Sequence, residues 1–139
     1  MAKINSKIFK ANDIRGKYPS EINEKIISEI SRNLSFYFSQ LAGQRSAKIV
    51  VAHDARLSSP GLYNSAITSL NGRNLKRLKI IQVGLSTTPM FYFLVKKSKA
   101  IGGIMITASH NPKNYNGLKI IDENALPISG WKIKKLFKL

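Results

Sequence analysis

Cysteine is absent from the sequence, which excludes a disulfide framework, thiol catalysis and cysteine-ligated zinc. Acidic residues are scarce: 7 Asp and Glu face 23 Lys and Arg, giving a formal net charge of +16 at pH 7. No apolar run is long enough to span a bilayer; Met90–Val95 is among the longest. Residues 1–12 lack the continuous apolar stretch of a signal peptide. These absences predict a cytoplasmic protein without a membrane partner.

Several motifs of known chemistry are also missing. Neither G-x-G-x-x-G nor G-x-x-x-x-G-K-[ST] occurs, so dinucleotide binding and P-loop nucleotide binding have no motif here. The G-x-S-x-G elbow of serine hydrolases is absent as well. The two histidines, His53 and His110, lack metal-ligand spacing, so a metal site made by this chain alone is not expected.

What is present is a chain of 139 residues with 43% hydrophobic residues, enough for one domain with a buried core. Its charge is uneven, because no acidic residue lies between Asp54 and Asp122. Such a region favours phosphate-bearing ligands, although solvated lysines on element ends are the alternative. Nucleic-acid binding is the lesser hypothesis, since no zinc-finger, RNP-like or GXXG motif accompanies the charge. Ten basic residues fill the region: Arg56, Arg73, Lys76, Arg77, Lys79, Lys96, Lys97, Lys99, Lys113 and Lys119.

Hydrophobic periodicity predicts alternating strands and helices. Residues 20–42 form an apolar stripe at helical spacing, with Ser20 as the expected N-cap and Gly43 as the stop. The further expected elements are strands over 47–52, 78–83, 100–107 and 117–122, and helices over 59–71, 90–97 and 129–139. The apolar residues of the last helix, including Trp131, Ile133 and Phe137, have little visible sequence left to pack against, so the chain looks interrupted.

This alternation predicts an α/β layered sheet. In such sheets the loops beyond the carboxyl ends of the strands usually form the ligand site. Four polar loops are therefore the candidates: Asn12–Gly16, His53–Ser59, Gly84–Pro89 and Thr107–Gly117.

The loop that begins at Thr107 carries the most chemistry. Ser109 is a candidate nucleophile or phosphate carrier, and His110 and Lys119 are candidates for hydrogen bonding or proton transfer. The alternative is a polar turn, because Asn-Pro and Asn-Gly are both strong turn dipeptides.

Two other loops each hold an acid and an arginine two residues apart. Asp54 and Arg56 predict a partly buried ion pair and a helix cap that hold their loop. Arg15 is a candidate phosphate ligand, with a surface ion pair to Asp13 as the alternative.

Four segments together resemble the α-D-phosphohexomutase superfamily, of the phosphomannomutase/phosphoglucomutase type. The segment GIMITASHNPKNYNGLK (Gly103–Lys119) is the most specific, and FKANDIRG (Phe9–Gly16), VVAHDARLSSP (Val50–Pro60) and GLSTTP (Gly84–Pro89) occur in the family's order. The resemblance implies a three-layer α/β/α sandwich with a mixed, mostly parallel sheet, the first of four family domains. It also implies a hexose phosphate as substrate.

The resemblance further implies a role for each matching residue. Ser109 matches the serine that carries the phosphoryl group between the 1- and 6-positions of the sugar through a bisphosphate intermediate. Mg²⁺ would bind through the phosphate on Ser109 and would be shared with the second domain. Lys119 matches a lysine that acts as a general acid/base or by electrostatics. Arg15 matches an arginine that supports the transferring group. His110 and Asn111 match residues that shape the loop and bind phosphate.

Two departures from the family pattern stand out: Asn12 replaces a usual tyrosine, and Ala52 replaces a common glycine. We expect residues 1–139 to be the phosphoserine domain only, without domains II–IV, and therefore inactive alone. The alternatives are a catalytically inactive stand-alone module that binds a phosphosugar or regulates, and the basic nucleic-acid-binding domain.

Overall fold

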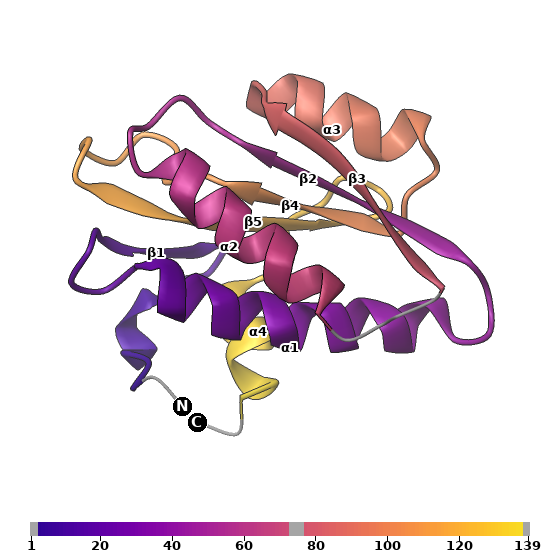
Figure 1. The fold of residues 1–139 in the computed structure, drawn as a ribbon, viewed down its shortest axis with the longest axis horizontal. Coiled ribbons are helices and arrows are strands. Elements are labelled where there is room, and N and C mark those ends of the chain that lie inside the picture. Colours follow the sequence, from indigo (N-terminus) through magenta and orange to yellow (C-terminus); the bar gives the residue numbers. More distant parts are fainter. Residues whose placement is uncertain (1–2, 73–76, 138–139) are drawn as a thin grey trace.

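A computed structural model describes residues 3–72 and 77–137, which form a five-stranded sheet with helices on both faces (Figure 1). Of the basic region noted above, Arg73 and Lys76 lie outside the described residues. The strands are β1 (Ile14–Lys17), β2 (Ala47–His53), β3 (Leu78–Leu85), β4 (Gly102–Ile106) and β5 (Tyr115–Asp122). The helices are the 3₁₀ turn η1 (Ser6–Ile8), α1 (Glu24–Ala42), α2 (Ser59–Asn71), α3 (Thr88–Lys97) and α4 (Gly130–Lys135).

The sheet is mixed and has the strand order β1-β5-β4-β2-β3. β2 pairs in parallel with β3 and β4, whereas β5 pairs antiparallel with β4 and β1. Within the described chain, β5 alone therefore runs against the other four strands. The carboxyl ends of β2, β3 and β4 consequently meet the amino end of β5 at one edge of the sheet, where the candidate loops lie.

Two hydrophobic cores lie on opposite faces of the sheet. One packs α1, α2 and α4 against Ile49, Val51 and Ile104, and the other packs α3 against Val50 and Met105. The alternation of Val50 and Val51 between the two cores follows from the two-residue period of a strand. Figure 1 shows α3 on one side of the sheet and the other helices on the opposite side. The predicted three-layer α/β/α sandwich is confirmed.

The start of α1 differs from the prediction. Asn23, not Ser20, is the N-cap, and its side chain accepts a hydrogen bond from the N–H of Ile26. Ser20 belongs to a turn that follows a cis Tyr18–Pro19 bond. Gly43 ends the helix as predicted, with φ of 60° and its N–H donating to two carbonyls of the last turn.

The predicted loop at Asn12–Gly16 is in large part a strand. Ile14–Lys17 pairs with Tyr115–Leu118, so Arg15 projects from the sheet edge rather than from a loop. The strand has only four residues, and three of them are arginine, glycine and lysine. It therefore shows no clear alternation of apolar and polar residues, which is why the hydrophobic pattern missed it. The segment 107–117 is shorter as a loop than predicted, because β5 begins at Tyr115.

The end of the chain also corrects the prediction. Ile133 is fully buried, and the Phe137 ring lies 5.7 Å from the Phe9 ring. These side chains therefore do find a packing surface, formed by the N-terminal segment, while Trp131 stays 60% exposed. The helix α4 ends at Lys135, and Lys138 and Leu139 lie outside the described residues.

None of the described helices combines the length and the apolar character that crossing a membrane requires.

Candidate functional site

The loop after β4 holds Ser109 in an unusual backbone conformation. Ser109 has φ of 51°, in the left-handed region that side-chain-bearing residues rarely adopt. Its N–H donates to Thr107 Oγ1 over 3.0 Å, and the Asn111 N–H donates to the Ala108 carbonyl over 3.0 Å. These bonds form a tight turn that presents the half-buried Ser109 at the sheet edge.

A cavity of about 380 Å³ lies beside Ser109. It unites three of the residues that the sequence singled out, namely Ser109, His110 and Lys119. The other lining residues come from the end of β2, the start of α3 and the end of β4: Asp54, Ser86, Thr87, Thr88, Met105 and Thr107. Three of the four predicted loops thus meet in one cavity.

Lys119 reaches this cavity from β5, where it pairs with Met105 of β4. Its Nζ lies 6.0 Å from the centroid of the Tyr92 ring, a cation–π contact that holds the ammonium on the α3 side of the sheet. Tyr92 is a residue that sequence reasoning did not single out, because it lies between Phe91 and Phe93 in an apolar helical segment that is typical of a core.

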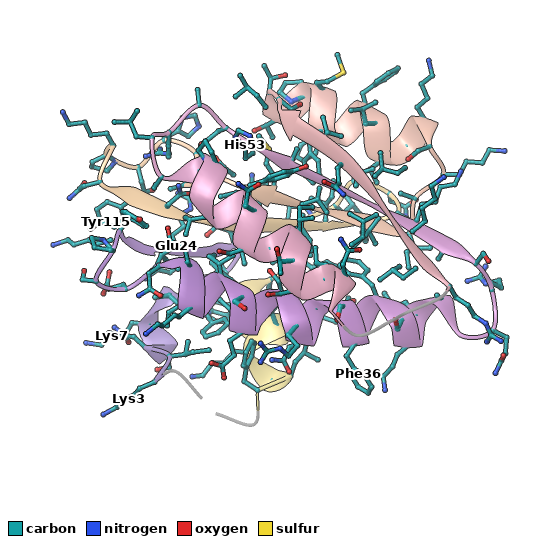
Figure 2. The ribbon with its side chains drawn as sticks, viewed as in Figure 1. Lys3, Lys7, Glu24, Phe36, His53 and Tyr115 are labelled. Carbon is teal, nitrogen blue, oxygen red and sulfur yellow. The ribbon has the colours of Figure 1, made fainter. Side chains whose placement is uncertain are left out.

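Arg15 and Asn111 lie on a second cavity, of about 740 Å³. Arg15 Nη1 donates to Asn111 Oδ1 over 2.6 Å, which ties β1 to the Ser109 loop. Arg15 also forms an ion pair with Asp13, but Asp13 is buried, so this pair is not the surface ion pair that was the alternative. Lys7 and Tyr115, labelled along one margin of the molecule in Figure 2, line this second cavity as well. The predicted site residues therefore divide between two cavities, with the Ser109 loop common to both.

The Asp54–Arg56 pair is confirmed as a partly buried ion pair, with 3.2 Å between Oδ2 and Nε. Ser58 is the N-cap residue of α2, but its side chain accepts no hydrogen bond from a helix N–H. Instead Ser59 donates to Asp54 Oδ1 over 2.5 Å, and Ser58 Oγ accepts from Asn116 Nδ2 over 2.8 Å. Hydroxyls and amides thus join the start of α2 to β5.

Thr107 and Asn116 are the residues that sequence reasoning missed. Asn116 is fully buried, donates to the hydroxyls of Ser58 and Ser59, and accepts from the N–H of Gly117. A buried amide must find such partners. Asn116 offered no signal in the sequence, because the Asn-Gly dipeptide predicted a turn there and the strand was expected to begin at Gly117. Thr107 gave none, because threonine is common at the ends of strands.

His53 supports the neighbouring loops rather than the cavity. Its Nδ1 donates to the Asp54 carbonyl over 2.7 Å, and its ring lies 4.9 Å from the Tyr63 ring. The Tyr63 hydroxyl accepts from the N–H of Gly84 over 3.2 Å. Burial raises the pKa of Tyr63, and the Gly84 bond lowers it by a smaller amount, so the phenol stays neutral near pH 7.

The described residues do not fit a magnesium site of their own. Residues 3–72 and 77–137 contain no group of three His, Cys, Asp or Glu side chains that could hold a metal. Asp54 faces the cavity, but both of its oxygens already accept hydrogen bonds, from the Arg56 backbone, Ser59, Thr107 and the Arg56 side chain. Ser109 is left as a single candidate ligand position.

Comparisons with known proteins agree with this geometry. The family described as phosphoglucomutase/phosphomannomutase, alpha/beta/alpha domain I, matches residues 6–139. A protein of Xanthomonas campestris named for phosphohexose mutases is 40% identical over 121 residues, which is 87% of this chain and 25% of that protein. A Klebsiella pneumoniae phosphomannomutase is 43% identical over 88% of this chain and 72% of its own length.

Solved structures show the same fold. The crystal structure of a phosphoglucomutase/phosphomannomutase family protein from Burkholderia thailandensis superposes with a TM-score of 0.79 at 31% identity. The match covers 97% of this chain and 30% of that one. The chain therefore spans about a quarter to a third of most of these relatives.

Proposed function

Because the chain belongs to the phosphoglucomutase/phosphomannomutase family, we propose that it is the phosphoserine-bearing domain of a phosphohexomutase. The observation that carries the proposal is the convergence of Ser109, His110 and Lys119 on one cavity at the sheet edge. Ser109 projects there from a strained turn, and such conformations gather at active sites. The substrate class would be a hexose phosphate.

The proposed reaction moves a phosphoryl group between Ser109 and the sugar. The bond between phosphorus and Ser109 Oγ breaks, and a bond forms between phosphorus and the oxygen of a free sugar hydroxyl. That hydroxyl loses its proton, and Ser109 Oγ gains one. A sugar bisphosphate results, and the reverse step with its other phosphate returns the phosphoryl group to Ser109, so that the net change is a move between the 1- and 6-positions.

The neighbouring residues suit this chemistry. The Lys119 ammonium lines the Ser109 cavity and would offset charge that develops on the phosphoryl oxygens. The exposed His110 lines the same cavity and is the second group there that can carry a proton. Arg15 retains free N–H donors after its bonds to Asp13 and Asn111, so it can support a phosphate from the other side of the loop.

Residues 1–139 would accept a phosphoryl group on Ser109, but would not complete the full move between the 1- and 6-positions alone. Most of the relatives are three to four times as long, and the described residues supply one metal-ligand position. Mg²⁺, bound through the phosphate on Ser109 and through groups outside these residues, would supply further charge neutralisation. Since phosphorylated sugars do not cross membranes freely, the cytoplasm is the compartment that we propose.

Intact-mass measurement tests the proposal. The purified chain is incubated with glucose 1,6-bisphosphate or mannose 1,6-bisphosphate, and we expect one added phosphate that disappears in Ser109→Ala. Ser46→Ala, at an exposed serine that does not line the cavity, serves as a control that keeps Ser109. The proposal fails if the phosphate persists in Ser109→Ala, or if no phosphate is found either on the chain as isolated or after incubation.

A further inference from the structure

All the N–H donors of the Arg56 side chain are used in hydrogen bonds to the Ser109 loop and to Asp54. Its Nη2 donates to the carbonyls of Ser109 and Asn111 over 2.9 and 2.8 Å. Its Nη1 donates to the carbonyls of Pro112 and Tyr115 over 2.7 and 3.1 Å, and its Nε donates to Asp54. A guanidinium has five N–H donors, so none is left for a phosphate. Arg56 can therefore act on the reaction only through the loop.

Asp54 acts on the same loop through a second route. Its Oδ2 accepts the hydroxyl proton of Thr107 over 2.8 Å, which leaves a lone pair of Thr107 Oγ1 for the N–H of Ser109 over 3.0 Å. Asp54 thereby fixes the direction of the Thr107 hydroxyl. The two routes converge on Ser109 and support its left-handed conformation, which is unfavourable for a residue with a side chain.

These contacts determine where the next peptide group points. The Ser109 carbonyl faces Arg56, and in a trans peptide the N–H points to the side opposite the carbonyl. The N–H of His110 is thus turned away from Arg56, and it has no hydrogen-bond partner within the described part of the chain. His110 lines the cavity beside Ser109.

We propose that Arg56, Asp54 and Thr107 are positioning residues that aim the backbone N–H of His110 at the phosphoryl group carried by Ser109. The inference rests on the proposed function, because it concerns the phosphorylated serine. A backbone N–H held in this way stabilises the phosphoryl oxygens without reorganising when they gain charge. Arg56 then contributes without touching substrate.

The test uses the full chain, labelled with ¹⁵N, with either serine or genetically encoded phosphoserine at position 109. The readout is the change in the His110 amide proton shift between the two forms. We expect a downfield move in the wild-type chain that Arg56→Lys reduces by at least half, because a lysine cannot hold four carbonyls. Arg45→Lys, at an exposed arginine, is the matched control and should keep the full change.

A second pair of variants keeps the test decisive if Arg56→Lys fails to fold. Thr107→Val removes the hydroxyl and should reduce the His110 change, whereas Thr107→Ser should retain it. Unchanged amide shifts of buried residues such as Ile104 identify the variants that remain folded.

An equal His110 change in wild type, Arg56→Lys and Thr107→Val would overturn the inference, as would a wild-type His110 amide that does not respond to phosphorylation. Because phosphoserine is installed directly, these outcomes do not depend on whether the chain acquires phosphate by itself. Failure of the mass experiment above would instead overturn the proposed function.

Discussion

Two Asp-x-Arg pairs flank the Ser109 loop. In the first pair the aspartate is the more buried residue, and in the second pair it is the arginine. In the first pair the Asp13 side chain is 5% exposed and that of Arg15 25%. In the second pair the Asp54 side chain is 21% exposed and that of Arg56 13%. With the same two-residue spacing, the guanidinium of Arg15 is therefore open to a cavity on one side of the loop, whereas that of Arg56 is covered by the loop on the other side.

The partners of the two arginines explain this difference. Arg15 binds side-chain oxygens, of Asp13 and Asn111, and these can rearrange when a ligand arrives. Arg56 binds four backbone carbonyls, which fix the path of the chain. Arg15 is therefore suited to ligand contact and Arg56 to positioning, although their local sequences are alike.

Gly117→Ala should have the largest effect on the environment of Arg15. An added Cβ would lie 1.8 Å from the carbonyl oxygen of Ile14, so β1 must separate from β5 and take Arg15 with it. We expect a loss of at least about 3 kcal/mol in the free energy of unfolding, measured with urea. Gly72→Ala, at a helix end where the added Cβ would lie 3.3 Å from the carbonyl oxygen of Thr68 and so make a far milder contact, is the control and should change stability by less than about 1 kcal/mol. Similar losses for the two variants would contradict the close pairing of β1 with β5.

Arg15→Ala tests the burial of Asp13, because it leaves the buried carboxylate without its ion-pair partner. Within the described residues, Arg15 is the side chain that hydrogen-bonds Asp13. We expect a loss of about 3 kcal/mol in urea unfolding. The double variant Asp13→Asn/Arg15→Gln removes both charges and should lose only about 1 kcal/mol. Equal losses would show that burial of Asp13 does not determine the effect.

Arg56→Ala should cost less stability, about 2 kcal/mol, although it removes more hydrogen bonds. Asp54 keeps Ser59 and Thr107 as donors, and the space that the Arg56 side chain leaves can admit water to the carbonyls that it bound. The same urea titration gives the value. A loss greater than that of Arg15→Ala would reverse the order that the two burial patterns predict.

The sequence predicts most of this architecture, because long apolar runs with helical or strand period identify their elements directly. The cavity with Ser109, His110 and Lys119 was predictable for a related reason, since strands of a layered sheet bring their following loops together. The position of Arg15 on a different cavity could not be predicted in this way. That position depends on β1, a four-residue edge strand whose pairing is set by tertiary contacts.

The supporting contacts were still harder to predict. Asp54 and Arg56 were expected to hold their own loop, yet Arg56 contacts carbonyls 53 to 59 residues away. Backbone acceptors leave no trace in the identity of the residues that carry them. Asn116 and Thr107 likewise gain their roles from partners on distant elements.

The proposed role of this chain depends on a phosphoryl group carried by Ser109. The most direct measurement is tandem mass spectrometry of the peptide spanning Ser109, after incubation of the full chain with a hexose 1,6-bisphosphate. We expect a single phosphate that is localised to Ser109 and is absent from Ser109→Ala. A phosphate localised to another hydroxyl, such as Ser86 or Thr88, with Ser109 unmodified would contradict it.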